Sequence, residues 1–579
     1  MPPAVACSPR NDARARDGRR RAWAAWVGWL ALAVAWFAPL GHRALVNPDE
    51  GRYATIALEM LRDGDWITPH LNGFLYFEKP PFGYWMSAAA MSLFGVGEFA
   101  ARLWPAASGF ASAAIVAFTA RRLWSEPAGS FAAPVAAGSV WIVANAHFLS
   151  LDMGLAFFLT LALCAFLLAQ RDEAAPLDQR RWMLVAWVAM AGATLTKGLV
   201  GLLIPGAALV LYCLWMRTAQ PLRRLQWVAG PAIFLALAAP WFVVVSLRNP
   251  GFADFFFVHE HFHRYLTDQA HRAGPAWYFV PMLLLGFLPW STMLPSLARF
   301  AAVREPGRAF QPQRFLLVYA AFVFVFFSAS RSKLPSYILP MFPALALLAG
   351  AWLAKADPRR LRVHVAAPAV AGVALMALAP LLARFATRDT PVEVLEAMAP
   401  GVAAGGALML GAATLAQRVF GQGRALAGVV VLAAGTVLGT LAVLDGHDEH
   451  ASIKSSRDVA AVLRPRLSAD TPVFSVAMYD QTLPFYLDRS VTLVAWTDEF
   501  AFGQRRDPGR WIPTVDEFAV RWRALDDGAA MMKSDVWSSL SASGLPMHVV
   551  YRDARRVVVL RRAPDPCKPG APCFPSHAL

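Results

Sequence analysis

Long apolar runs are the feature that most constrains this chain, because about 20 consecutive apolar residues can cross a bilayer as one helix. Lipid offers no partners for backbone polar groups, so repeated runs of this length favour a bundle of membrane-spanning helices. The fold class we predict is a polytopic α-helical membrane protein with about 13 transmembrane helices. The expected spans are 22–40, 104–120, 129–147, 153–170, 182–196, 198–216, 227–247, 277–298, 314–330, 334–353, 363–383, 401–417 and 425–444.

The basic residues predict how these spans are oriented, because short cytoplasmic loops carry an excess of Lys and Arg. If the basic tail 1–21 is cytoplasmic, the loops 41–103 and 248–276 face the other side, which is the periplasm in a bacterium. Thirteen spans place the C-terminal segment there as well. In a bacterium, such a protein would lie in the inner (plasma) membrane. The loops assigned to the cytoplasm all contain basic residues, namely Arg121 and Arg122; Arg171, Arg180 and Arg181; Arg217, Arg223 and Arg224; Arg299, Arg304, Arg308 and Arg314; Lys355, Arg359, Arg360 and Arg362; and Arg418 and Arg424.

Composition agrees with a membrane protein. Hydrophobic residues make up 57% of the chain and charged residues only 16%, which excludes an ordinary soluble protein. The formal net charge of +15 would suggest nucleic acid in a soluble chain, but here it follows from topology, and no nucleic-acid partner is expected. Of the five cysteines, Cys164 and Cys213 lie inside apolar runs, whereas Cys567 and Cys573 could close a small loop in an oxidising compartment.

The segment 445–579 changes to an α/β pattern. A helix is expected over 452–467, with Ser455 or Ser456 as its cap. Short strands are expected within 471–479, 490–496, 547–552 and 555–562, and the last two could form a hairpin. We therefore predict three parts: a cytoplasmic tail (1–21), a transmembrane domain (22–444) and a small periplasmic α/β domain (445–579).

The loop 41–103 is the strongest candidate for a functional site. It is dense in charge, aromatics and proline, and it is far longer than a connection requires. A helix lying in the membrane interface is expected from Glu50 to Arg62. Asp49 precedes it and has two interpretations: an N-cap or first-turn acid, or a catalytic carboxylate at the outer membrane surface.

Other charged groups are expected on the same side. Asp152 begins the fourth span, and the same two interpretations apply to it. Glu78 and Lys79 precede two helix-breaking prolines; Lys79 suits a phosphate, or it is a snorkelling interfacial lysine. Lys197 and the segment 330–337 add further cations and a tyrosine, and a basic outer loop is more easily explained by an anionic ligand than by topology.

The second long outer loop contains three alternating histidines. His259 and His263 would share one helical face and could form a metal-binding pair, with His261 between them. The alternative is a mobile gate whose histidines bind nothing. Arg264 follows, and together with Lys79 it would make a clamp for a diphosphate or phosphodiester.

These stretches resemble a known family. PDEGRYATIALEMLRDGDWITPHLNGFLYFEKPPFGYW and FGVGEFAARLWPA resemble the first periplasmic loop of bacterial 4-amino-4-deoxy-L-arabinose transferases that act on lipid A. TLTKGL, EHFHRY and KLPSYILPMFPALALLAG are similar to further family segments, in the same order. These enzymes are polyprenyl-phosphate-dependent type C glycosyltransferases related to the protein O-mannosyltransferases. The resemblance covers most of the transmembrane domain and little of residues 360–579.

The resemblance implies an inverting glycosyltransferase whose donor sugar is carried by undecaprenyl phosphate, with no nucleotide cofactor. By motif, Asp49 would be the principal catalytic carboxylate and Asp152 a second acid. The implied substrate-binding residues are Lys79, Arg264 and Tyr337 at the donor phosphate, and Arg52, Tyr53, Tyr76 and Lys197 along the site. A possible divalent, zinc-like metal would be held by Glu78 with His259 or His261.

The implied acceptor is lipid A, and added aminoarabinose would neutralise its charge and give resistance to polymyxin and cationic antimicrobial peptides. A lipid A phosphate would need little deprotonation, whereas for a hydroxyl acceptor Asp49 would act as general base. Two alternatives stay open: a transferase onto protein or another glycan, and a flippase of polyprenyl-linked sugars. Against the flippase, the acids lie at span mouths on one side, whereas transporters place polar residues near the bilayer midplane.

Overall fold

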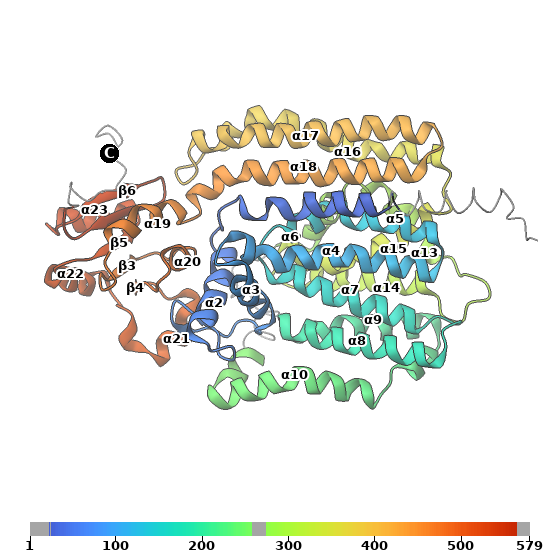
Figure 1. Ribbon diagram of the computed structural model, residues 1–579, viewed down its shortest axis with the longest axis horizontal. Helices are drawn as coiled ribbons and strands as arrows, with labels where there is room; N and C mark the ends of the chain where they lie inside the picture. The colour runs from blue at the N-terminus through green and yellow to red at the C-terminus, as the bar shows by residue number, and fades with distance from the viewer. Residues whose placement is uncertain (1–22, 24, 258–273, 564–579) are drawn as a thin grey trace, which may run out of the picture.

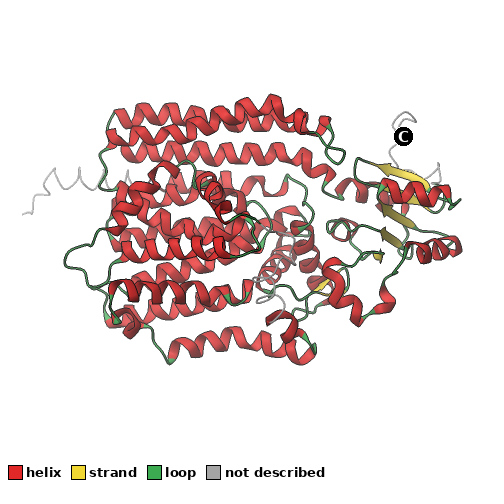
Figure 2. Ribbon diagram, turned by 180° about the vertical axis from the view of Figure 1, so that it is seen from behind, coloured by secondary structure: helices red, strands yellow, loops and turns green. Residues whose placement is uncertain are grey.

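The computed structural model describes Trp23 and residues 25–257 and 274–563, and it is mostly helical. Long helices lie side by side along one axis of the molecule (Figure 1). Figure 2 shows that the strands gather at one end, beyond the ends of these helices. The molecule is therefore a helical bundle with a mixed domain at one end.

The bundle is built from apolar helices. In chain order they are Ala25–Gly41, α4 (Glu98–Leu123), α5 (Glu126–Ala137) with α6 (Val140–Ala146), α7 (Leu151–Ala169), α8 (Pro176–Lys197), α9 (Val200–Met216), α10 (Ala229–Arg248), α12 (Phe279–Gly286) with α13 (Leu294–Ala302), α14 (Pro312–Ala329), η6 (Pro335–Met341) with α15 (Phe342–Leu353), α16 (Ala366–Leu378) flanked by η7 (Pro358–Val365) and η8 (Ala379–Phe385), α17 (Val392–Gly421) and α18 (Ala425–Ile453).

Among the described residues, eight helices are long and apolar enough to cross a membrane, and two bent pairs raise this number to ten. The remaining predicted spans coincide with two shorter apolar helices, Ala25–Gly41 and α9, and with α8. A polytopic helical membrane protein is therefore confirmed, whereas the count of thirteen stays a prediction. The expected span 277–298 is not one straight helix, because the two halves meet at a bend of 113°. Pro289 lies in the break, where it cannot donate a backbone hydrogen bond.

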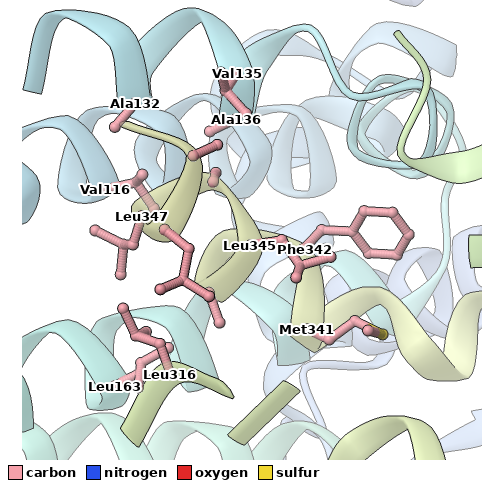
Figure 3. Close-up of a cluster of buried hydrophobic side chains, with 14 of the residues drawn as sticks. Val116, Ala132, Val135, Ala136, Leu163, Leu316, Met341, Phe342, Leu345 and Leu347 are labelled. Atoms are coloured by element: carbon pink, nitrogen blue, oxygen red, sulfur yellow. The ribbon is translucent and has the colours of Figure 1, made fainter. Parts of the chain in front are cut away.

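The bundle packs around an apolar core rich in alanine and leucine. Val116, Ala132, Leu163, Leu316 and Leu347 come from five different helices and point toward one another (Figure 3). Small residues let helix backbones approach closely, as membrane bundles require. This core fixes the ends of α7, α8 and α14, where the candidate site lies.

The first long loop folds into a compact layer between the bundle and the C-terminal domain (Figure 1). It contains α2 (Asp49–Asp63), the two-stranded hairpin β1 (His70–Leu71) and β2 (Phe74–Leu75), and α3 (Phe82–Phe94). The predicted helix 50–62 is therefore confirmed as α2, whereas its placement in the membrane interface stays a prediction. It ends at Gly64, whose φ of 70° is the left-handed conformation that glycine adopts without cost.

The C-terminal segment forms a five-stranded mixed sheet in the order β4-β3-β5-β7-β6. The helices of this segment are α19 (Arg457–Leu463), α20 (Leu483–Leu487), α21 (Ala501–Arg506), α22 (Val515–Ala524) and α23 (Ser534–Ala542), and the strands are β3 (Val473–Val476), β4 (Thr492–Val494), β5 (Ala529–Met532), β6 (His548–Arg552) and β7 (Val557–Leu560). All four predicted strands are present, and β6 and β7 form the expected antiparallel hairpin. The fifth strand, β5, was not predicted, because its sequence AAMM has little β propensity. Ser456 is the N-cap residue of α19, but its side chain makes no capping hydrogen bond.

The first loop and the C-terminal segment share one hydrophobic cluster, which includes Ile56 and Tyr84 from the loop and Leu483 from the C-terminal segment. Asn72 hydrogen-bonds the backbone of Val491 in both directions, with its Nδ2 2.7 Å from the carbonyl and its Oδ1 2.7 Å from the N–H. The two segments therefore pack as one unit.

Candidate active site

A cavity of about 140 Å³ lies at the end of the bundle nearest the first loop. Its walls come from the turn before α3, from α7, from the junction of α8 and α9, and from α14 and η6. The structure therefore brings together five residues that the sequence had singled out separately. These five are Glu78, Lys79, Asp152, Lys197 and Tyr337, and the others in the lining are Leu155, Val200, Phe326, Phe327, Ser330, Ser332, Ser336 and Pro340.

Asp152 is held through both of its carboxylate oxygens. Lys197 at the end of α8 makes an ion pair with Oδ1, and the Ser336 hydroxyl donates a hydrogen bond of 2.9 Å to Oδ2. The N-cap of α7 is Ser150 rather than Asp152. The Lys197 ammonium also lies 4.9 Å from the ring centroid of Tyr337, within range of a cation–π contact. Asp152 is thus the counter-ion of a lysine whose charge faces the cavity.

Glu78 and Lys79 follow β2 and lie where the chain turns into α3. The Lys79 ammonium donates a hydrogen bond of 2.7 Å to the Glu78 carbonyl and lies 3.9 Å from its carboxylate. Both side chains are mostly buried, with 15% and 20% of their surfaces exposed for Lys79 and Glu78. Two lysines, Lys79 and Lys197, therefore face one small cavity, an arrangement that suits an anionic ligand.

Asp49 is the first residue of α2 and follows the N-cap residue Pro48, so it is a first-turn acid rather than the N-cap. Its side chain is 33% exposed, and Oδ1 lies 2.9 Å from Nη1 of Arg52. The other arm of Arg52 lies 2.5 Å from the carboxylate of Glu499, which is 4% exposed and belongs to the C-terminal domain. Burial raises the pKa of Glu499, and Arg52 opposes that shift. Arg52 thus bridges Asp49 to the C-terminal domain.

Three tyrosines lie close to Arg52, the partner of Asp49. Tyr53 and Tyr84 have ring centroids 5.9 Å apart, and Tyr76 is buried close by. Among the described residues, the hydroxyls of Tyr76 and Tyr84 have no hydrogen-bond partner. Burial, followed by the charges of Asp49 and Asp152, raises the pKa of Tyr53. The charges of both acids thus reach Tyr53, but Asp49, Arg52, Tyr53 and Tyr76 are not among the residues that line the cavity.

Some predicted residues lie outside the described part of the chain, namely His259, His261 and Arg264. Within residues 25–257 and 274–563, no group of three or more His, Cys, Asp or Glu side chains could hold a metal ion. Glu78 is the predicted metal ligand that the structure describes, and it lies on the cavity wall. Lys333 does not line the cavity, because its ammonium hydrogen-bonds the carbonyls of Ser328 and Ser330 at the end of α14.

Sequence reasoning missed two residues of this region, Tyr84 and Glu499, and it named Ser336 without predicting its hydrogen bond to Asp152. Ser336 adjoins Tyr337 in a segment already noted for its polar residues, which was a usable signal. Tyr84 belongs to the same aromatic stretch as Lys79. Glu499 had no local signal, because its partner Arg52 lies in a distant part of the chain.

Two family models match the chain. The model described as "Aminoarabinose transferase C-terminal domain" matches residues 459–561. The model described as "Dolichyl-phosphate-mannose-protein mannosyltransferase" matches residues 25–259. The two matches fall on the C-terminal sheet and on the part of the chain that contains α2 and the first helices of the bundle.

Solved structures match almost the whole chain. The crystal structure of ArnT from Cupriavidus metallidurans bound to undecaprenyl phosphate superposes with a TM-score of 0.89 and 38% sequence identity, covering 94% of this chain and 98% of that one. The apo state of the same protein gives a TM-score of 0.88, also at 38% identity, and the match covers 93% of this chain and 98% of that one.

Curated relatives match over a shorter region. Undecaprenyl phosphate-alpha-4-amino-4-deoxy-L-arabinose arabinosyl transferase 2 of Pseudomonas fluorescens is 35% identical over 57% of this chain and 56% of its own length. Undecaprenyl phosphate-alpha-4-amino-4-deoxy-L-arabinose arabinosyl transferase of Aeromonas salmonicida is 35% identical over 62% of this chain and 66% of its own length. The chain thus spans less than two thirds of these relatives.

Proposed function

The chain belongs to the aminoarabinose transferase family that includes ArnT of Cupriavidus metallidurans, and from this premise we propose that it is a glycosyltransferase of the bacterial inner membrane. It moves 4-amino-4-deoxy-L-arabinose from undecaprenyl phosphate to lipid A. The reaction takes place on the periplasmic side, where thirteen spans and a cytoplasmic N-terminus put the first loop and the C-terminal domain. The basic loops at the opposite end of the bundle support this orientation.

One observation carries the proposal: the cavity combines two lysines and a tyrosine with apolar walls. A polyprenyl phosphate has the matching chemistry, an anionic head on an apolar tail. Undecaprenyl phosphate is the ligand of the Cupriavidus metallidurans ArnT crystal structure, to which this chain is 38% identical.

The proposed chemistry is displacement at the anomeric carbon with undecaprenyl phosphate as the leaving group. The acceptor oxygen forms the new bond as the carbon–oxygen bond to the donor phosphate breaks, which inverts the configuration. Lys79 and Tyr337 on the cavity wall stabilise the charge that develops on the departing phosphate. Arg264, which lies outside the described residues, has the same role by its motif. Lys197 assists them, held in place by Asp152. Asp49 is the carboxylate with an exposed face, and it orients the acceptor or accepts its proton.

Mass spectrometry of lipid A tests this proposal. The host would lack its own transferase but make the aminoarabinose carrier lipid, and it would express this chain or its Asp49→Asn variant. We expect an aminopentose mass increment on lipid A with the native chain, none with the variant, and a matching gain of polymyxin resistance. A well-expressed native chain that leaves lipid A unmodified would refute the acceptor. An increment on a glycoprotein or another glycan would then identify the alternative acceptor.

A divalent metal belongs to the same proposal. Glu78 lies on the cavity wall, and we propose that it holds the ion together with His259 or His261. The metal would supply a fixed positive charge near the phosphate. We expect purified protein to contain close to one equivalent of zinc by elemental analysis, and the Glu78→Gln variant to contain much less. Equal metal content in the native protein and the variant would contradict this role for Glu78.

A further inference from the structure

Glu50, the residue after Asp49, is a buried hydrogen-bond centre that the proposed chemistry does not use. Its side chain is 0% exposed, and it accepts four hydrogen bonds. Nε and Nη2 of Arg102 each donate at 2.7 Å, one to each carboxylate oxygen. The backbone N–H groups of Leu149 and Val46 donate at 2.8 and 3.0 Å. All the lone pairs that face the protein are thus engaged.

Arg102, near the start of α4, is equally sealed, with a side chain that is 0% exposed. Besides its two bonds to Glu50, it donates to the carbonyls of Leu40, Arg43 and Ala44 at 3.2, 2.6 and 2.7 Å. All five N–H groups of the guanidinium therefore have acceptors. A lysine could not reproduce this fork, because its ammonium has three donors on one atom.

The pair connects the two segments that present the acids. Glu50 is next to Asp49 in the first turn of α2. The N–H of Leu149 donates to Oε1 of Glu50, and Leu149 lies three residues before Asp152 at the start of α7. Arg43 adds a second link, because its guanidinium donates to the carbonyl of His147. Asp49 and Asp152 thus stand on chain segments that meet at one carboxylate.

We propose that Glu50 and Arg102 form a buried positioning pair that sets the placement of Asp49 relative to Asp152. The pair touches no ligand and transfers no proton. It acts through the backbone of two segments, each of which carries one acid of the site. This inference rests on the proposed function, in which Asp49 acts on the acceptor and Asp152 holds Lys197 near the donor phosphate.

Charge and geometry both support this role. A buried ion pair is retained only when its remaining hydrogen-bonding groups are satisfied, as they are here. Although burial opposes ionisation of the carboxyl group, Arg102 holds the pKa of Glu50 below its usual value, so Glu50 stays ionised and cannot serve as an acid at neutral pH. A displacement of about 1 Å in an active site can lower a rate about a hundredfold, so loss of the Glu50–Arg102 pair should lower the transfer rate measurably.

The test compares Glu50→Gln and Arg102→Lys with a control, Gln311→Ala, in the full-length protein in nanodiscs. Gln311 is a similar buried centre that bonds Glu305 and Arg308, and it precedes α14 at the end remote from the cavity. We expect both test variants to lower the kcat of transfer at least about tenfold, with the KM for the donor lipid changed less than about threefold. Gln311→Ala lowers the thermal midpoint but leaves kcat within about twofold.

Two results would overturn the proposal. One is a kcat within about twofold of the native value in Arg102→Lys, since charge without the fork would then suffice. The other is an equal loss of kcat in Gln311→Ala, which would make the effect one of general destabilisation. If the native chain transfers no sugar, the proposed function fails. Hydrogen exchange then tests separately whether Glu50 and Arg102 hold the two segments together. Glu50→Gln must then speed exchange in peptides covering 44–52 and 147–153 but not around 311, and unchanged exchange would refute the pair.

Discussion

Three of the four acids of α2 have three different environments. Asp49 keeps a third of its side chain exposed, Glu50 is sealed against Arg102, and Glu59 accepts a hydrogen bond of 3.0 Å from the N–H of Gly73. Consecutive residues on a helix point about 100° apart, so neighbours in the sequence can serve opposite purposes. Glu50 is the acid that is buried in the first turn, because it pairs with Arg102 from a different helix.

Glu59 predicts a specific dependence of stability on pH. Burial, with a contribution from Asp63, raises the pKa of its carboxyl group to about 7. An unfolded Glu titrates near about 4.3, so between about 4.3 and 7 the folded chain binds more protons than the unfolded chain. The stability of the folded state therefore falls as pH rises through this window and stays at the lower level above it.

The variant Glu59→Gln removes this dependence. We expect the stability of the variant to match that of the native protein near pH 4.5 and to exceed it at pH 8 by on the order of 1–3 kcal/mol. The measurement is the thermal midpoint of both proteins across this pH range, followed by intrinsic fluorescence. Parallel midpoint curves for the two proteins across this range would show that Glu59 is ionised in the fold at neutral pH.

At the scale of elements, apolar runs predicted the bundle well, because a helix of the right length is the only way to bury such a run in lipid. The bend between α12 and α13 could not be predicted from hydropathy, which reports apolar length but not direction. β5 was missed for a related reason. Its alanines and methionines form a strand because β3 and β7 lie on either side of it, so tertiary pairing overrides a weak local preference.

The residues of the candidate site were predictable where they belong to short sequence motifs. Lys79, Lys197 and Tyr337 were named from three separate segments, and the fold brings them to one cavity. Glu499 was not predictable, because its meaning depends on Arg52 from the other side of an interface. The C-terminal family match at 459–561 extends the family to a segment where the sequence alone showed little resemblance.

At the scale of the whole molecule, the first loop and the C-terminal domain pack together at one end of the bundle. Arg52 reaches Glu499 across this interface, and Thr55 donates a hydrogen bond of 3.0 Å to the carbonyl of Gln481. The helix that carries Asp49 is therefore held from two sides, by α4 through Arg102 and by the C-terminal domain. The placement of the candidate catalytic acid therefore depends on α4 and on the C-terminal domain as well as on the first loop.

Gly51 tests this dependence. A Cβ at Gly51 would lie 2.5 Å from the backbone nitrogen of Thr482, so Gly51→Ala must push α2 and the C-terminal domain apart. We expect a loss of stability on the order of 1–3 kcal/mol and a loss of transfer activity at least about tenfold, since Asp49 and Arg52 move with α2. The matched control is Gly411→Ala in α17, where a Cβ would have nothing within 4 Å.

The control isolates the interface from the general effect of the substitution. Alanine is the better helix former by about 1 kcal/mol, so Gly411→Ala should keep or raise the thermal midpoint and leave transfer unchanged. The same intrinsic gain applies at Gly51, and only the close approach of Thr482 reverses its sign. If Gly51→Ala behaved like Gly411→Ala in both measurements, the C-terminal domain would not hold α2, and the site would be a property of the bundle and first loop alone.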